Sequence, residues 1–152
     1  MIAALDTNIL AYAEGVNGSA MKELALGLLE RLPRGAAVLP VQTLGELFNV
    51  LVKKARRTPV NARAAILSWR NSFRLVETSP ATMLAAADLA ADHQFGIWDA
   101  VILSAAAAAD CQLLLSEDLH DGFIWRGVTI VNPFAPIKHA LLDELLEGSG
   151  YP

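Results

Sequence analysis

The sequence predicts a three-layer α/β/α domain built on a mostly parallel sheet of five strands. Short apolar runs without polar alternation are typical of strands that are covered on both faces. These runs alternate along the chain with segments that have helical spacing, which favours a parallel sheet between two helical layers. The 152 residues, 54% of them hydrophobic, are enough for one domain with a sizeable core.

Five apolar runs are expected to form the strands. They cover residues 2–5, 36–40, 74–77, 113–115 and 128–131. The first run ends at Asp6, and Thr7 and Asn8 are residue types that cap a following helix. Ligands bind at the carboxyl ends of strands in open α/β sheets, so Asp6 is either a binding group or an acidic cap.

Capping signals and apolar spacing predict the helices between these strands. Four expected helices cover residues 19–32, 43–55, 99–110 and 137–147. Two more begin at a proline: one opens at Thr58-Pro59, and the other runs from Ser79-Pro80 to His93. Proline fits the first turn of a helix, and Ser19 is expected to cap the first long helix. Gly96 is expected to end the helix before it by adopting the left-handed conformation.

The composition favours a cytoplasmic protein. The single cysteine, Cys111, excludes an intramolecular disulfide and suits a reducing compartment. The longest apolar run, residues 100–109, is too short to span a bilayer, and no targeting segment precedes the first strand. We therefore expect no contact with a membrane.

Charge is unevenly distributed along the chain. The net charge is −4, yet residues 53–74 contain seven lysines and arginines and no acid. The densest part of this segment is Lys53, Lys54, Arg56 and Arg57. Such a cluster either binds a polyanion such as RNA or forms the solvated ends of two helices, where the helix dipole favours cations.

Four acids stand at the junctions between elements: Asp6, Glu46, Asp99 and Asp118. Each has a structural explanation, since Thr43 and Glu46 match a capping box and the helix dipole stabilises Asp99. Together they would meet at one edge of the sheet and repel one another. A divalent cation would relieve that repulsion, and carboxylate ligands suit Mg²⁺ or Mn²⁺ rather than zinc.

Other chemistries have little support in the sequence. The three histidines lack metal-ligand spacing, Cys111 has no catalytic partner, and no serine-hydrolase or nucleotide-binding motif occurs. A phospho-receiver module also clusters acids at strand ends, but it needs an aspartate where Glu77 ends the third strand.

Five motifs occur in order along the chain. They are Asp6-Thr7-Asn8, Gln42-Thr43-Leu44-Gly45-Glu46, Trp98-Asp99-Ala100, Leu115-Ser116-Glu117-Asp118-Leu119 with Asp121-Gly122, and Asn132-Pro133-Phe134. In this combination the chain resembles the PIN-domain ribonucleases, and in particular the VapC-type toxins of VapBC toxin–antitoxin pairs. The resemblance covers about residues 2–134.

The resemblance implies a site and a reaction. The four acids named above would be both the catalytic residues and the ligands of Mg²⁺ or Mn²⁺. Thr7, Asn8 and Ser116 would support them, and Glu117 would be a further, less certain ligand. The first strand would lie beside the fourth, the reaction would be the hydrolysis of RNA phosphodiesters, and the basic segment would position the RNA.

The resemblance also implies an organisation and partners. Residues 1–134 would form the PIN-like nuclease domain, and residues 135–152 a C-terminal helical tail that packs on the same domain. We expect a cognate antitoxin and a homodimer. Two alternatives stay open: a solitary PIN nuclease in RNA processing, and a catalytically silent RNA-binding domain of the same fold.

Overall fold

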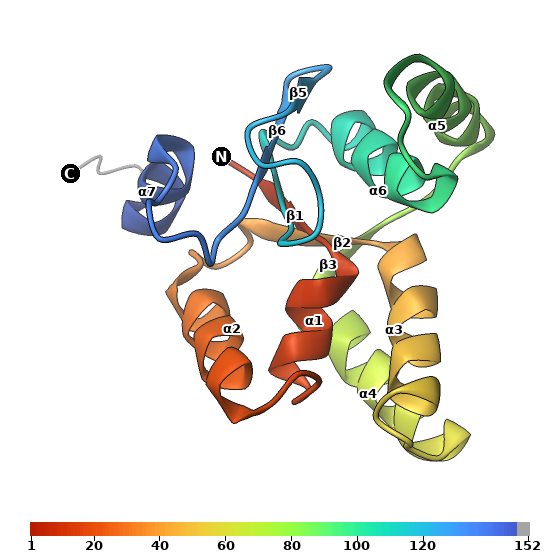
Figure 1. Ribbon diagram of the computed structural model, residues 1–152, viewed down its shortest axis with the longest axis vertical. Helices are drawn as coiled ribbons and strands as arrows, with labels where there is room; N and C mark the ends of the chain where they lie inside the picture. The colour runs from red at the N-terminus through yellow and green to blue at the C-terminus, as the bar shows by residue number, and fades with distance from the viewer. Residues whose placement is uncertain (149–152) are drawn as a thin grey trace.

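The computed structural model describes residues 1–148 and has a six-stranded sheet at its centre, in the order β3-β2-β1-β4-β6-β5 (Figure 1). The strands are β1 Ala3–Leu5, β2 Ala37–Pro40, β3 Arg74–Val76, β4 Leu113–Leu115, β5 Ile124–Trp125 and β6 Val128–Val131. Every neighbouring pair from β3 to β6 is parallel, which confirms the five predicted parallel strands.

The sixth strand, β5, was not predicted. It pairs antiparallel with β6 at the edge of the sheet through a two-residue turn at Arg126 and Gly127. Both turn residues have positive φ, 46° and 81°, which is the conformation that a tight hairpin requires. A strand of two residues is too short to give a periodic pattern, so the sequence contained no sign of it.

Seven helices flank the sheet in the described part of the chain. They are α1 Thr7–Ala13, α2 Ser19–Arg31, α3 Val41–Lys53, α4 Pro59–Ser72, α5 Pro80–His93, α6 Ile97–Ala108 and α7 Ala140–Glu147. The two predicted proline starts are confirmed, because Thr58 caps α4 and Ser79 caps α5 through hydrogen bonds from backbone amides.

Two predicted helix ends were wrong. Ser19 does not cap α2; it is the first helical residue, after Gly18, whose φ is 96°. The left-handed residue after α5 is Gln94, with φ 58°, and not Gly96. Gly96 has φ −60° and is instead the N-cap residue of α6, because α6 begins two residues earlier than predicted.

Alternate residues of each strand face opposite helical layers. Ala3 and Leu5 of β1 pack in one buried cluster with residues of α1, α2, α3, α4 and α7. Ala4 points to the other face and packs with α5 and α6. Figure 1 shows α5 and α6 together on one side of the sheet, and α1 to α4 on the other. The three-layer architecture is therefore confirmed, and no helix within residues 1–148 is long and apolar enough to cross a membrane.

The C-terminal helix α7 adds two leucines to the first layer. Leu142 and Leu145 are 1% and 2% exposed and belong to the same buried cluster as β1 and α1. The last four residues of the tail, 149–152, lie outside the described residues. Burying these leucines attaches α7 to the sheet, since each removes a large apolar side chain from water.

The substitution Leu142→Ala is expected to lower the free energy of unfolding by about 2–4 kcal/mol, because it leaves a cavity under α7. Urea denaturation would measure this loss. Leu84→Ala on α5 is the matched control, since Leu84 is 69% exposed and should change stability by no more than about 0.5 kcal/mol. Equal effects of the two substitutions would mean that α7 does not pack on the sheet.

Candidate acidic site

The register between β1 and β4 brings two polar residues together at one edge of the sheet. Leu5 pairs with Leu115, so Asp6 and Ser116 leave the sheet side by side. The backbone amide of Asp6 donates to the carbonyl oxygen of Leu115 at 3.0 Å. The order of the strands along the chain reverses between β1 and β4, which is the point where open α/β sheets bind ligands.

Asp6 is almost completely buried and firmly held. Its side chain is 4% exposed. The hydroxyl of Ser116 donates to Oδ2 at 2.6 Å, and the backbone amide of Thr7 donates to Oδ1 at 2.7 Å. Asp6 is thus the N-cap residue of α1, which confirms the interpretation as an acidic cap, and it also lies near the other acids.

Asn8 links the two strand ends. Its amide nitrogen lies 3.2 Å from Oγ of Ser116 and 3.2 Å from Oδ2 of Asp118, and 3.4 Å from Oδ2 of Asp6. Its carbonyl oxygen accepts from the backbone amide of Glu117 at 3.3 Å. One side chain therefore fixes the loop after β4 against the start of α1.

Glu46 reaches the site because α3 begins earlier than the sequence indicated. The helix starts at Val41, so Thr43 lies inside it and its hydroxyl donates to the carbonyl of Pro40 at 2.7 Å. The capping box is therefore not formed. Glu46 instead accepts from the hydroxyl of Thr7 at 2.5 Å, which joins α3 to α1.

Gln42 is a supporting residue that the sequence analysis missed. Its amide nitrogen donates to Oε1 of Glu46 at 3.2 Å. The spacing of four residues on one helix was a signal that could have identified it, because such residues are neighbours on the helix surface. With Thr7 on one oxygen and Gln42 on the other, the carboxylate of Glu46 has a fixed orientation.

Burial and mutual repulsion raise the pKa of two of these carboxyls. Burial, opposed by the bonds from Ser116 and Thr7, raises the pKa of Asp6 to about 6, and the charges of Asp99 and Glu46 add to the rise. Burial also raises the pKa of Asp99, as do the charges of Glu46 and Asp118. The four acids predicted from the sequence thus lie near enough to one another for their charges to interact.

Glu117 has a different environment. Its carboxylate accepts from the hydroxyl of Tyr12 on α1 at 2.8 Å. Burial, together with the negative charge of Glu117, raises the pKa of Tyr12 to about 12. Tyr12 gave no signal in the sequence, and its bond holds Glu117 against α1.

The basic segment is partly structural. Arg57 forms an ion pair with Glu14 at 2.9 Å, and Glu14 also accepts from the indole nitrogen of Trp69 at 2.8 Å. This is the one salt bridge within residues 1–148. The carboxylates of the acidic site therefore have no cationic partner in the described part of the chain, while Lys53, Lys54 and Arg56 are exposed.

Two cavities flank the acidic site and share Asp118. The first, of about 390 Å³, lies between α1 and α3 and is lined by Glu46, Lys54 and Asp118 among others. The second, of about 370 Å³, lies beside the start of α6 and is lined by Asp99 and Asp118. An extended ligand lying through both would cross the carboxylates between them.

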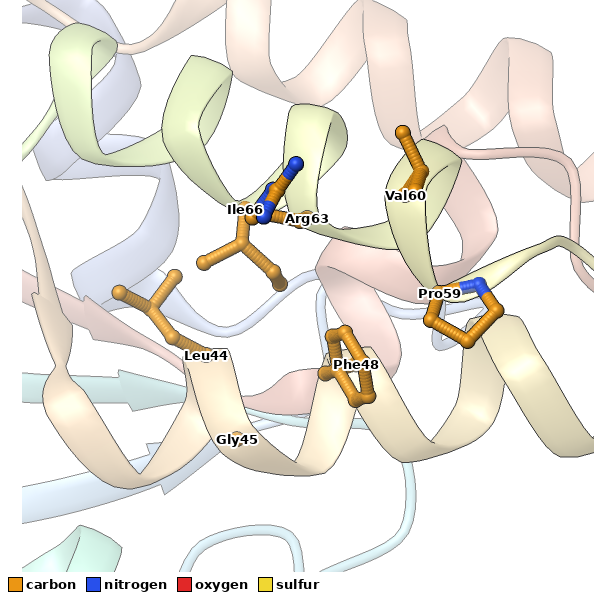
Figure 2. A pocket seen from close by; sticks show the side chains of 7 residues that line it. All are labelled: Leu44, Gly45, Phe48, Pro59, Val60, Arg63 and Ile66. Carbon is orange, nitrogen blue, oxygen red and sulfur yellow. The ribbon is translucent and has the colours of Figure 1, made fainter.

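A third hollow is apolar, and none of the four acids lines it. Figure 2 shows it between α3 and α4, with Leu44 and Phe48 on one side and Ile66 on the other. Its volume is about 370 Å³, and Arg63 is the one charged residue of its lining. It contains no group that could carry out hydrolysis, although it lies on the same helix as Glu46.

The donor chemistry of the acidic site fits a hard divalent cation. Carboxylate oxygens without cationic partners are the ligands that Mg²⁺ prefers, usually with several waters retained. Within residues 1–148, no three Asp, Glu, His or Cys side chains lie close enough together to hold one ion directly. Water would therefore complete the coordination shell.

Solved structures of similar fold include several toxins and toxin complexes. VapC20 of Mycobacterium tuberculosis, a sarcin–ricin loop cleaving toxin, is 20% identical with a TM-score of 0.64, over 76% of this chain and 89% of that one. A toxin–antitoxin complex from Klebsiella pneumoniae is 24% identical with a TM-score of 0.64, over 87% and 98%. DNA-bound VapBC from Salmonella typhimurium is 17% identical with a TM-score of 0.60, over 86% and 96%.

No curated protein sequence matches the chain. The model of the PIN domain family, however, matches residues 3–120, a stretch that contains all four acids of the site and most of the sheet. The fold, the order of the acidic motifs and this match agree, and the chain belongs to the PIN domain family.

Proposed function

We propose that the protein is a metal-dependent endoribonuclease that hydrolyses RNA phosphodiester bonds. The observation that carries the proposal is the convergence of Asp6, Glu46, Asp99 and Asp118 at one sheet edge without a cationic partner in the described residues. Such a site binds divalent cations and repels free phosphate, so an ion is needed before a phosphodiester can approach.

Mg²⁺ or Mn²⁺ is the cofactor that this donor set suits. Within residues 1–148 no three of these acids lie close enough together to hold one ion directly, so the four acids would hold it partly through bound water. A cation bound there would offset the charge of the phosphate and lower the pKa of the attacking water. The residues around the acids have positioning roles: Ser116 and the Thr7 amide hold Asp6, and the Thr7 hydroxyl and Gln42 hold Glu46.

The substrate would approach through the cavity between α1 and α3. Lys54 is the only lysine or arginine among the residues that line the two cavities, and it lies in the same lining as Glu46 and Asp118. A lysine there can contact the RNA backbone without reading its sequence. Lys53 and Arg56 are exposed nearby in the chain and can extend that contact.

The protein is proposed to be the toxin of a toxin–antitoxin pair. Several of the structures that share its fold are complexes of a toxin with an antitoxin. The apolar hollow between α3 and α4 offers such a partner a surface beside the helix that carries Glu46 (Figure 2). We place the protein in the cytoplasm, where its buried free thiol at Cys111 stays reduced.

Asp99→Asn is expected to lower the rate of RNA cleavage by roughly a hundredfold or more, because several kcal/mol of charge stabilisation are lost. The side chain of Asp99 receives no hydrogen bond from any group in residues 1–148, so the substitution removes charge without breaking such a bond. The assay is the cleavage of a mixed pool of structured and single-stranded RNA with Mn²⁺ or Mg²⁺, and with EDTA.

Asp88→Asn is the control for this experiment, since Asp88 is an exposed aspartate on α5. It should cleave at the wild-type rate. Cleavage that persists in EDTA, or that Asp99→Asn leaves unchanged, would contradict the proposal. Binding of RNA without cleavage under any metal condition would indicate the silent RNA-binding alternative.

The stability of the metal-free protein should fall as the pH is raised from about 4 to about 6. The pKa of Asp6 is about 6 in the folded protein and 3.8 ordinarily, so the folded state binds this proton more tightly than the unfolded chain does. The loss amounts to about 3 kcal/mol, complete above the folded pKa. Urea denaturation in EDTA across this range would measure it.

In the same experiment, Asp6→Asn should remove most of the decline, and Asp88→Asn should leave it unchanged. Added Mn²⁺ should stabilise the wild type more at pH 7 than at pH 5, because its ligands must be ionised. A pH dependence that is the same in the wild type and Asp6→Asn would contradict the burial of this charge.

A homodimer is the proposed state of the chain on its own. Light scattering at micromolar concentration should give twice the mass of 16.3 kDa. Addition of the protein encoded by a neighbouring gene should raise the mass further and inhibit cleavage if that protein is the antitoxin. A monomeric mass would contradict the homodimer, and active monomers that co-purify with no partner would favour the solitary nuclease.

A further inference from the structure

The cavity between the end of α5, the start of α6 and the loop after β4 differs in chemistry from the acidic site that it adjoins. Asp99 and Asp118 form one wall. The remainder of the lining is aromatic, polar or small, apart from the aliphatic Leu119: His93, Gln94, Phe95, Gly96, Leu119, His120 and Phe123. A site for a metal and a phosphate alone would not need these groups.

The aromatic wall is an ordered cluster. The rings of Phe95 and Phe123 have centroids 5.1 Å apart, and the ring of His93 meets Phe123 edge-on at 5.4 Å. Both phenylalanines are half-buried and pack against the core that α5 and α6 share, so the aromatic cluster is held in place. His93 and His120 are exposed at its rim.

The two rim histidines have unused hydrogen-bonding groups. Neither imidazole makes a hydrogen bond to another group within residues 1–148. His139, the third histidine, differs, because its Nδ1 accepts from the backbone amide of Leu141 and caps α7. The structure therefore gives His139 a structural role and leaves His93 and His120 free for a ligand.

We propose that this cavity binds the base of an unstacked nucleotide next to the scissile phosphate, with His93 and His120 as substrate-contacting residues. The proposal rests on the nuclease function proposed above. Aromatic faces and imidazole donors are the groups with which proteins bind single-stranded bases. The carboxylate wall disfavours a phosphate in the cavity and can accept hydrogen bonds from the amino groups of a base.

The position of Asp118 indicates how the substrate would run between the two cavities. It lines this cavity and also the one that contains Lys54. A base in the aromatic cavity thus leaves its sugar and phosphate at the carboxylates, and the backbone can continue toward Lys54. The volume of about 370 Å³ is in the range of small-ligand sites.

The test is the double substitution His93→Ala and His120→Ala, with His139→Ala as the matched control for the loss of an imidazole. With unstructured RNA and Mn²⁺, the double variant should have a KM about tenfold higher and nearly the same kcat. A tenfold change is the effect expected from losing one stacking contact with a base. Mapping of the cut sites should show a weaker base preference at one position beside the cut. A KM and a cut-site map equal to those of the control would overturn the proposal.

A second measurement does not depend on cleavage. Adenosine, cytidine and uridine would be titrated into the metal-free protein while the aromatic ring signals of His93, His120 and Phe123 are followed by NMR. Changes in these ring signals, in a protein that cleaves no RNA, would support the base site and contradict the proposed nuclease function. The opposite outcome is RNA cleavage with no change in the ring signals and with the KM and cut sites of the double variant unchanged. It would support the nuclease function and overturn the base site.

Discussion

The accumulation of negative charge at the β1–β4 edge is the constraint on which the rest of the structure depends. Asp6 is buried there among three other carboxylates, and its raised pKa shows that the ionised form is disfavoured. A fold that keeps such a group must hold it by hydrogen bonds, which Ser116 and the Thr7 amide supply. The excess negative charge that remains favours binding of a cation. The same carboxylates therefore cause the repulsion and would provide the ligands for the proposed activity.

The same network explains how distant elements reach the site. Thr7 contributes its amide to Asp6 and its hydroxyl to Glu46, so one residue at the start of α1 connects β1 with α3. Asn8 connects α1 with the loop after β4. Glu14, at the other end of α1, fixes the α3–α4 connection through Arg57 and Trp69. Helix α1 is only seven residues long, yet its first two residues connect β1, α3 and the loop after β4 at the site.

The two cavities beside the acids are proposed to bind different parts of the substrate. One contains Lys54 and suits the charged backbone of a nucleic acid, while the other has aromatic and imidazole groups that suit a base. Their shared residue, Asp118, lies where a linkage between the two would pass. The apolar hollow between α3 and α4 is separate from both and lends itself to a protein partner (Figure 2).

Much of the fold was predictable because its signals are local. Unbroken apolar runs predicted the five parallel strands, and the proline starts predicted the caps at Thr58 and Ser79. The beginning of α3 was not predictable in this way. The capping box at Thr43 and Glu46 was a sound local interpretation, but β2 passes directly into the helix at Val41, and Glu46 pairs with Thr7 instead.

By itself, the sequence determined the layers of the domain and singled out four acids as candidates, since hydrophobic periodicity and the order of motifs are properties of the chain. Only the tertiary structure decided which groups surround those acids. The parallel register sets Ser116 beside Asp6, and Arg57 is bound to Glu14 rather than exposed. His93 and His120 have no distinctive spacing in the sequence, and only the structure shows that they line the cavity next to Asp99 and Asp118. The reason is physical: contacts between residues far apart in the chain depend on strand order and packing, which no local pattern encodes.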